Sequence, residues 1–334
     1  MLEPPDLSDE SIIEALDASF GIRVAAVVFL PIGDDPDSWA YRVEQAGGPA
    51  YFLKVRTRAA HGPGTAVPYY LHKQGVPHVL APLPTATDAP YIHVTRFALT
   101  LYPMIDGGNG ADVGLSPDHL RELGAVMKQI HTLPVTEDLV RIVKRESFRP
   151  SRRELFDDLQ ARLRASDLDP VARELSAFWR ARQEVIHSVV DQADAMGREL
   201  GRLSFHYVLC HADLHAWNLL IDPEERLWIV DWDEAIVAPK ERDLMFVVGG
   251  IGTSLEPRDT EWFLQGYGEV TIDQRLLAYY RYAWAVQDVC AYGEDVFLSP
   301  TLRNETRRAS LHGFKNLFEP GSIVEIATTT PPLP

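Results

Sequence analysis

Three side chains that end in carboxylate or amide oxygens have the spacing expected of a single catalytic centre. Asp213 and Asn218 lie on one polar stretch, and Asp231 follows the next apolar run. The intervening segment reads as two short strands, Leu219–Ile221 and Leu227–Val230, joined by the turn Asp222–Glu225. A hairpin brings its two ends side by side, so Asn218 and Asp231 should be neighbours, with Asp213 on the adjoining loop.

This set of side chains suits phosphoryl transfer. Mg²⁺ prefers oxygen ligands and keeps phosphates and water in its remaining positions, which fits Asn218 and Asp231. A carboxylate must also orient the attacking hydroxyl and accept its proton, and Asp213 fits that role. Each residue alone is a common turn or cap residue, but the complete pattern favours a catalytic site.

A second interpretation uses the histidines around Asp213. His211, Asp213 and His215 could bind Zn²⁺ as in a metallohydrolase. That reading leaves the hairpin and Asp231 without a role, so we favour a His211 that braces the loop by hydrogen bonds. Asp243 is expected to cap a helix or to anchor the same loop.

The motifs resemble those of a known family. His211-Ala-Asp213 with Asn218, and Ile229-Val-Asp231, resemble the catalytic loop and the metal-binding aspartate of the aminoglycoside phosphotransferase family, a branch of the protein-kinase-like fold. Among its branches the sequence is most similar to the spectinomycin phosphotransferases. The resemblance implies ATP or GTP as phosphate donor, Asp213 as base, and Asn218 and Asp231 as Mg²⁺ ligands. It extends through Asp231–Glu234, Ala238–Met245, Gly266–Glu269, Tyr279–Arg281, Tyr292–Asp295 and Val324–Ala327.

The resemblance also implies a nucleotide site in the first hundred residues. Lys54 ends an apolar strand, where the family has its phosphate-binding lysine, and Gly33–Ser38 takes the place of the loop over the phosphates. That loop lacks G-x-G-x-x-G and contains three aspartates. Kinases of this fold hold the lysine with a glutamate on the next helix, but no acid occurs between Lys54 and Asp88. Another group must therefore hold the Lys54 side chain in position.

The hinge that meets the adenine is expected at Leu101–Ile105. The predicted nucleotide-binding residues are Ser38, Lys54, Leu101, Tyr102 and Met104.

The elements that position these residues change type along the chain. A helix over 8–20, with Ser8 as N-cap and Gly21 as its stop, should precede a set of antiparallel strands. The strands are predicted at Val24–Leu30, Trp39–Gln45, Ala50–Val55, His78–Leu83 and Tyr91–Phe97.

Beyond a linker at Gly107–Gly110 the pattern becomes helical, apart from the hairpin segment. Ser116–Pro117 should open a helix that buries Leu120 and Leu123. Further helices are predicted over Pro170–Leu203, 259–267, 273–295 and 300–316.

These elements, with the resemblance, predict an α+β, bilobal protein-kinase-like fold with a small β-rich N-lobe and a larger, mostly helical C-lobe. The N-lobe should span 1–105 and end in the hinge, the C-lobe should span 106–327, and 328–334 should be a disordered tail.

The charge of the chain bears on its partners. A net charge of −16 argues against nucleic acid, because binding it requires neutralisation of phosphates by basic residues. A cationic or polyhydroxylated small molecule fits better, with Trp217 and Trp232 as possible walls of its site. The acids that could face such a substrate are Asp233, Glu234, Asp288, Glu294 and Asp295.

Composition and hydropathy set the remaining expectations. No leader-like segment and no apolar run long enough to span a membrane stands out, so we expect a cytoplasmic protein without a membrane partner. Cys210 and Cys290 lie in apolar surroundings and should be buried free thiols. We expect a monomer or a weak homodimer.

The function expected on these grounds is transfer of the γ-phosphate of ATP to a hydroxyl of an aminocyclitol or aminoglycoside antibiotic, with Mg²⁺ as cofactor and spectinomycin as the first acceptor. Two alternatives stay open. One is a kinase of another hydroxylated molecule, such as a sugar, choline, homoserine or a nucleoside antibiotic. The other is a nucleotide-binding protein without transferase activity.

Overall fold

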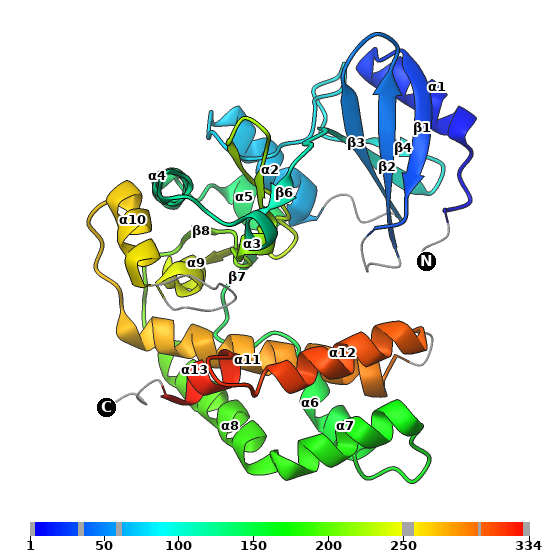
Figure 1. Ribbon diagram of the computed structural model, residues 1–334. Coiled ribbons are helices and arrows are strands. Elements are labelled where there is room, and N and C mark those ends of the chain that lie inside the picture. Colours follow the sequence, from blue (N-terminus) through cyan, green and yellow to red (C-terminus); the bar gives the residue numbers. More distant parts are fainter. Residues whose placement is uncertain (1–3, 33–36, 58–61, 249–256, 300–301, 330–334) are drawn as a thin grey trace. The chain divides into compact units, whose positions relative to one another are not determined.

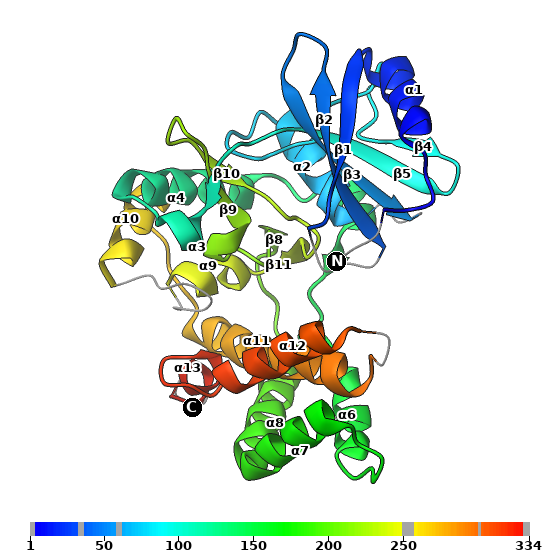
Figure 2. The ribbon, with the colours of Figure 1, turned by 45° about the vertical axis from the view of Figure 1, so that its right-hand side comes forward.

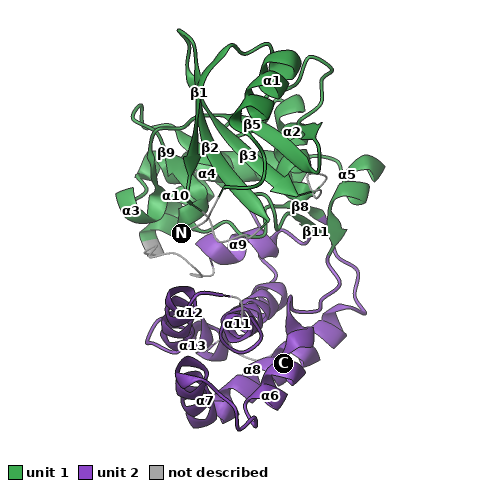
Figure 3. Cartoon of the chain, turned by 90° about the vertical axis from the view of Figure 1, so that its right-hand side faces the viewer, with its two compact units in different colours: residues 1–145, 208–237, 256–269 green, residues 146–207, 238–255, 270–334 purple. Residues whose placement is uncertain are grey.

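The computed structural model describes residues 4–32, 37–57, 62–248, 257–299 and 302–329. Two units, each built from separate stretches of the chain, divide the protein (Figure 3). The first unit comprises 1–145, 208–237 and 256–269, and the second comprises 146–207, 238–255 and 270–334. The first unit thus contains both the β-rich region and the loop predicted to be catalytic, and it continues beyond residue 105, where the N-lobe was predicted to end.

The first unit begins with helix α1 and a five-stranded sheet (Figure 1). Helix α1 (Asp9–Phe20) is capped by the Ser8 side chain, and Gly21 ends it at φ 65°, as predicted. Every pair of neighbouring strands in the sheet is antiparallel, which confirms the expectation. The strands, in spatial order, are β1 (Val24–Leu30), β2 (Ser38–Gln45), β3 (Ala50–Thr57), β5 (Phe97–Pro103) and β4 (Ile92–Val94).

The alternation of side chains along β3 separates a core from a polar face. Helix α1 covers one face of the sheet (Figure 2). Leu53 and Val55 join a buried cluster with Ile12 and Leu16 of this helix. Each such side chain stabilises the fold by about 1.5–3 kcal/mol. Successive strand residues point to opposite faces, so Lys54 and its strand neighbours two positions away face the other side.

Two predicted strands differ from the structure. His78–Leu83 forms only an isolated bridge between Val79 and Ile229, because His78 has φ 60° and prolines interrupt the segment at both ends. The predicted strand Tyr91–Phe97 is broken by a turn in which Thr95 has φ 53°, so β4 ends before it and β5 begins after it. Neither turn contains the glycine that would have revealed it.

The remaining elements of the first unit include the segment predicted to be catalytic. Helix α2 (Pro63–Lys73) follows β3, has 11 residues and contains Pro68. The expected linker at Gly107–Gly110 contributes a two-residue strand instead. The other elements of this unit are β6 (Gly108–Asn109), α3 (Gly110–Val113), α4 (Pro117–Thr132), α5 (Glu137–Ile142), β7 (Lys144–Arg145), β8 (Val208–Cys210), η2 (Ala216–Asn218), β9 (Leu219–Ile221), β10 (Leu227–Ile229), β11 (Ile236–Ala238, whose last residue belongs to the second unit) and α10 (Pro257–Tyr267).

Helices α4 and α10 pack against each other at two glycines. A Cβ on Gly124 would lie 2.1 Å from the Phe263 carbonyl oxygen, and one on Gly266 would lie 1.8 Å from the Arg121 carbonyl oxygen. Both obstacles are backbone atoms, which cannot rotate away. The close approach of the two helices therefore requires both glycines.

Gly266→Ala should lower the free energy of unfolding by about 2–3 kcal/mol, because the overpacking exceeds the small gain in helix propensity near the end of α10. Urea unfolding followed by circular dichroism measures it. Glu261→Ala, an exposed site on the same helix, should change stability by less than about 0.5 kcal/mol. Equal stability of Gly266→Ala and the parent protein would rule out the close contact.

The second unit is helical in its described residues. The predicted helix over Pro170–Leu203 is two helices separated at Arg182, whose φ of −120° breaks the helical path. The fully buried Trp179 stacks on Phe314, with ring centroids 5.2 Å apart. The elements of this unit are η1 (Arg153–Leu155), α6 (Phe156–Arg162), α7 (Pro170–Ala181), α8 (Gln183–Leu200), α9 (Glu241–Val247), α11 (Gln274–Phe297), α12 (Asn304–Asn316) and α13 (Ile323–Thr329).

The C-terminal end corrects one expectation. Helix α13 continues through Thr328 and Thr329, which the sequence assigned to a disordered tail, and residues 330–334 lie outside the described part. Cys210 and Cys290 are buried free thiols, as predicted. None of the helices in the described ranges is long and apolar enough to cross a membrane.

Candidate active site

The hairpin of β9 and β10 brings together the two residues predicted to hold a cation. Leu219 pairs with Ile229, and Ile221 pairs with Leu227, as the sequence pattern required. Just beyond the paired strands, the Val230 amide donates to the Asn218 carbonyl oxygen at 3.0 Å. Asn218 and Asp231 therefore lie at the same end of the hairpin.

Asp222 fixes the turn at the other end of this hairpin. Its carboxylate, 3% exposed, accepts hydrogen bonds from the backbone of Glu224 and Arg226 and from the side chains of Arg226 and Trp228. Burial alone would raise the pKa of Asp222, but the bond from Trp228, followed by those from Arg226, holds it below its usual value. The charged form of Asp222 thus stabilises the hairpin that aligns the site.

Asp222→Ala should lower the free energy of unfolding by about 2–3 kcal/mol at pH 7, because buried donors lose a charged acceptor. A depressed pKa gives stability that is complete above the unfolded value of about 3.9 and is lost as the pH falls through the folded value. The difference between Asp222→Ala and the parent protein should therefore be constant from about pH 5 to 8 and shrink at lower pH. Denaturant titrations at several pH values measure it, and a difference that grows with acidity would contradict this role.

The loop before the hairpin is held by His211. Its Nε2 lies 2.9 Å from the Val230 carbonyl oxygen, and its Nδ1 accepts the Asp213 backbone N–H at 3.2 Å. The fully buried ring also contacts Trp232, with centroids 4.5 Å apart. Both ring nitrogens therefore face backbone groups, which leaves neither for a metal and removes the basis of the metallohydrolase interpretation. Between His211 and Asp213, Ala212 has φ 68°, a strained conformation of the kind that clusters at functional sites.

Asp213 contacts both flanking polar residues. Asn218 Nδ2 donates to the Asp213 carbonyl oxygen at 2.8 Å and to its Oδ2 at 3.0 Å, and His215 Nε2 lies 3.3 Å from its Oδ1. Burial alone would lower the pKa of His215, but the hydrogen bond and charge of Asp213 outweigh it and raise that pKa. Asn218 and His215 thus hold the partly exposed side chain of Asp213 in a defined orientation.

The donor set next to Asp213 fits a hard divalent cation. Both hydrogen bonds from Asn218 use its amide nitrogen, which leaves the side-chain oxygen available as a ligand. Asp231 is exposed and has φ 60°, which Asp adopts more readily than most residues. Carboxylate and amide oxygens are the ligands that Mg²⁺ prefers.

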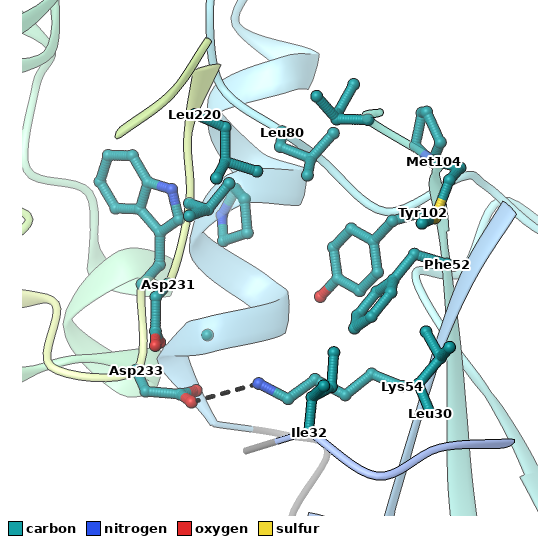
Figure 4. A pocket seen from close by; sticks show the side chains of 16 residues that line it. Leu30, Ile32, Phe52, Lys54, Leu80, Tyr102, Met104, Leu220, Asp231 and Asp233 are labelled. Atoms are coloured by element: carbon teal, nitrogen blue, oxygen red, sulfur yellow. Dashed lines mark ion pairs between the residues drawn. The ribbon is translucent and has the colours of Figure 1, made fainter. Parts of the chain in front are cut away.

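A pocket of about 370 Å³ in the same unit contains several residues that the sequence analysis expects to bind the nucleotide (Figure 4). Tyr102 and Met104 are among those that line it, and burial raises the pKa of Tyr102 to about 12. Leu101 does not line it, because the side chain lies in the core cluster and its carbonyl oxygen accepts from Leu83. The other lining residues are Leu30, Ile32, Phe52, Lys54, Gly64, Pro68, Leu80, Pro103, Ile105, Leu220, Val230, Asp231, Trp232 and Asp233.

Lys54 has a carboxylate partner that the sequence analysis missed. Its Nζ lies 3.5 Å from Asp233 Oδ2, and Arg56 donates to both oxygens of the same carboxylate (Figure 4 shows the Lys54 pair). Burial alone would raise the pKa of Asp233, but the bond from Arg56 and the charge of Lys54 keep it low. Asp233 therefore has protein cations as partners, where the sequence analysis expected a cationic substrate.

Other predicted residues have separate places. Ser38 starts β2 opposite Arg56 and does not line the pocket, and residues 33–36 of the expected phosphate loop lie outside the described part. Trp217 is 57% exposed and Glu234 is exposed. In the second unit, Asp243 is buried in the first turn of α9, Asp288 is half-buried on α11, Glu294 pairs with Arg152, and Asp295 accepts from Ser310.

Comparison with known proteins gives this geometry a context. The model of the phosphotransferase enzyme family matches residues 29–282. The chain belongs to this family. A spectinomycin phosphotransferase solved with ADP and spectinomycin is 30% identical, covers 98% of this chain and 100% of its own, and superimposes with a TM-score of 0.88. This phosphotransferase is therefore an enzyme of the small-molecule kinase class, and its α+β kinase-like fold is confirmed.

More distant structures show the same fold alone. An amicoumacin kinase solved with AMP-PNP and Ca²⁺ is 18% identical, with a TM-score of 0.62 over 98% of this chain and 96% of its own. A choline kinase from Streptococcus pneumoniae is 14% identical, with a TM-score of 0.56 over 93% and 99%. Among curated proteins, no sequence relative matches the phosphotransferase.

Proposed function

We propose that this kinase transfers the γ-phosphate of ATP to a hydroxyl of an aminocyclitol antibiotic, with spectinomycin as the first candidate. The observation that carries the acceptor is the full-length likeness to a spectinomycin phosphotransferase, at 30% identity. The observation that carries the chemistry is the convergence of Asp213, Asn218 and Asp231 on one loop and hairpin.

Each residue of this set has a defined task in the proposed reaction. Asp213 orients the acceptor hydroxyl and accepts its proton, while Asn218 holds Asp213 through its amide nitrogen. Asn218 and Asp231 would hold Mg²⁺ by their side-chain oxygens, and Mg²⁺ when bound would neutralise the charge of the phosphates. Lys54 places an ammonium group at the wall of the nucleotide pocket. Turnover typical of kinases is about 1–100 s⁻¹.

ADP release tests the proposal. Spectinomycin, other aminocyclitols, sugars, choline, homoserine and nucleoside antibiotics would be offered with Mg·ATP, and GTP would replace ATP in a parallel series. Turnover that depends on spectinomycin and disappears in Asp213→Asn would support the proposal. Activity only with another acceptor would retain the kinase and reject the aminocyclitol. Nucleotide binding without ADP release for any acceptor would count against catalysis itself.

A further inference from the structure

Three features of the chain fix the position of the Asp233 carboxylate, which we call its seat. Arg56 donates from Nη1 to Oδ1 at 2.9 Å and from Nη2 to Oδ2, a paired geometry that fixes the plane of the carboxylate. Lys54 Nζ lies 3.5 Å from the same Oδ2. The third feature is a space left by a glycine.

Gly64 makes room for the carboxylate. A Cβ at this position would lie 1.7 Å from Asp233 Oδ1, so no other residue leaves the seat open. Gly64 belongs to the first turn of α2, which begins at Pro63 after the N-cap Gly62. The partial positive charge at a helix N-terminus favours a carboxylate there.

The two cations have different relations to the nucleotide pocket. Lys54 and Arg56 are alternate residues of β3, so both side chains leave the same face of the sheet. Lys54 lines the pocket and Arg56 does not. The planar guanidinium group of Arg56 binds the carboxylate through two hydrogen bonds. The Lys54 ammonium group lies 3.5 Å from the carboxylate, longer than a typical hydrogen bond, and remains at the wall of the pocket.

We propose that Asp233 is the positioning residue of Lys54, which it holds in place for the nucleotide phosphates while Arg56 fixes Asp233. The proposal rests on the nucleotide-binding role assigned to Lys54 above. It accounts for a helix α2 without any acidic residue, because the carboxylate comes from the segment after β10 instead. The same segment carries Asp231 two residues earlier, so one hairpin would set both the cation ligand and the partner of the lysine.

The balance of charges favours a role in which Asp233 positions Lys54 over one in which it blocks the phosphate site. Two cations and one carboxylate leave one positive charge at the pocket wall, which is available to a phosphate. Without the carboxylate, the two like charges on the same face would repel, and the long flexible side chain of Lys54 would lose its defined direction. If Asp233 instead competed with the phosphates, its removal would strengthen nucleotide binding, so the sign of the effect separates the two roles.

Nucleotide binding measured by calorimetry tests this without any acceptor. Affinities for Mg·AMP-PNP and for adenosine would be measured for the parent protein, Asp233→Asn, Lys54→Met and the double variant. Asp233→Asn should weaken AMP-PNP binding about 10-fold, which corresponds to the loss of one charged hydrogen bond from Lys54 to a phosphate, and should leave adenosine binding unchanged. In the Lys54→Met background, Asp233→Asn should weaken AMP-PNP binding by no more than about twofold further, because the effects of substitutions at coupled residues are not additive.

Two further variants control for folding. Gly64→Ala should displace the carboxylate and weaken AMP-PNP in the same direction as Asp233→Asn. Asp88→Asn removes a lysine–carboxylate pair near the other end of α2, with Lys73, and should leave both affinities unchanged. These comparisons show whether loss of an ion pair by itself alters the pocket.

Three results would overturn the proposal: tighter AMP-PNP binding in Asp233→Asn, no change, or an undiminished 10-fold loss in the Lys54→Met background. Equal weakening of adenosine would also overturn it, because adenosine has no phosphate to meet Lys54. AMP-PNP binding without ADP release for any acceptor would count against the proposed transfer reaction and leave this test of Asp233 intact.

Discussion

Asp213→Asn should lower kcat by about 10²–10⁴-fold, the usual contribution of a positioned base, while the affinity for nucleotide stays unchanged. The reason lies in the separation of tasks within the site. Asp213 is not among the residues that line the pocket, and its carboxylate accepts a hydrogen bond from Asn218 and lies 3.3 Å from His215 Nε2. Removal of the proton acceptor at residue 213 should therefore leave the nucleotide affinity of the pocket unchanged.

Asparagine is the suitable replacement because it keeps the shape of the side chain. Its amide oxygen can still accept from Asn218, which holds the loop conformation, but it cannot take up the proton of an acceptor hydroxyl. ADP release, AMP-PNP affinity and thermal unfolding would be measured on the same preparations. Near-normal turnover in a folded variant would remove Asp213 from the role of base.

The geometry of the candidate site could be predicted from the sequence because it depends on local order. The turn Asp222–Glu225 between two apolar triplets is enough to place Asn218 beside Asp231, and the structure has the same strands within one residue. The order of β-rich and helical regions followed from the same kind of local pattern, since a change from period two to period 3.6 needs no long-range information, whereas the kinase-like fold was implied by the family resemblance.

The missed features depend on contacts between distant segments. Arg56 and Asp233 are 177 residues apart, and nothing local marks them as a pair. A signal was present only in part: Arg56 follows Lys54 by two positions on a strand, so it had to share its face. The absence of an acid on α2 showed that a partner was needed, but charge alone could not choose Asp233 among the acids.

Backbone conformations of single residues account for the wrong strand boundaries. His78 and Thr95 adopt positive φ values of 60° and 53°, which the residue type alone does not predict. Leu101 shows the same limit for side chains, because alternation along β5 turns it to the α1 face although its neighbour Tyr102 lines the pocket. A hinge assigned as a continuous segment cannot distinguish the two faces.

Asp231→Asn should lower kcat by about 10²–10³-fold and raise the Mg²⁺ concentration needed for half-maximal activity at least about 10-fold. The charge of Asp231 is the property tested, since the proposed cation site otherwise holds only the neutral amide oxygen of Asn218. Asparagine is again preferable to alanine, because residue 231 has φ 60° and Asn adopts this conformation at little cost. Adenosine affinity should not change.

The control for charge alone is Asp88→Asn, whose carboxylate pairs with Lys73 and does not line the nucleotide pocket. Its Mg²⁺ dependence should equal that of the parent protein. A Mg²⁺ titration of Asp231→Asn that superimposes on the parent curve would place the cation elsewhere. A shift in Mg²⁺ dependence with unchanged adenosine affinity would show that the substitution weakens the binding of Mg²⁺ and the phosphates. The part of the pocket that binds adenosine would then be independent of Asp231.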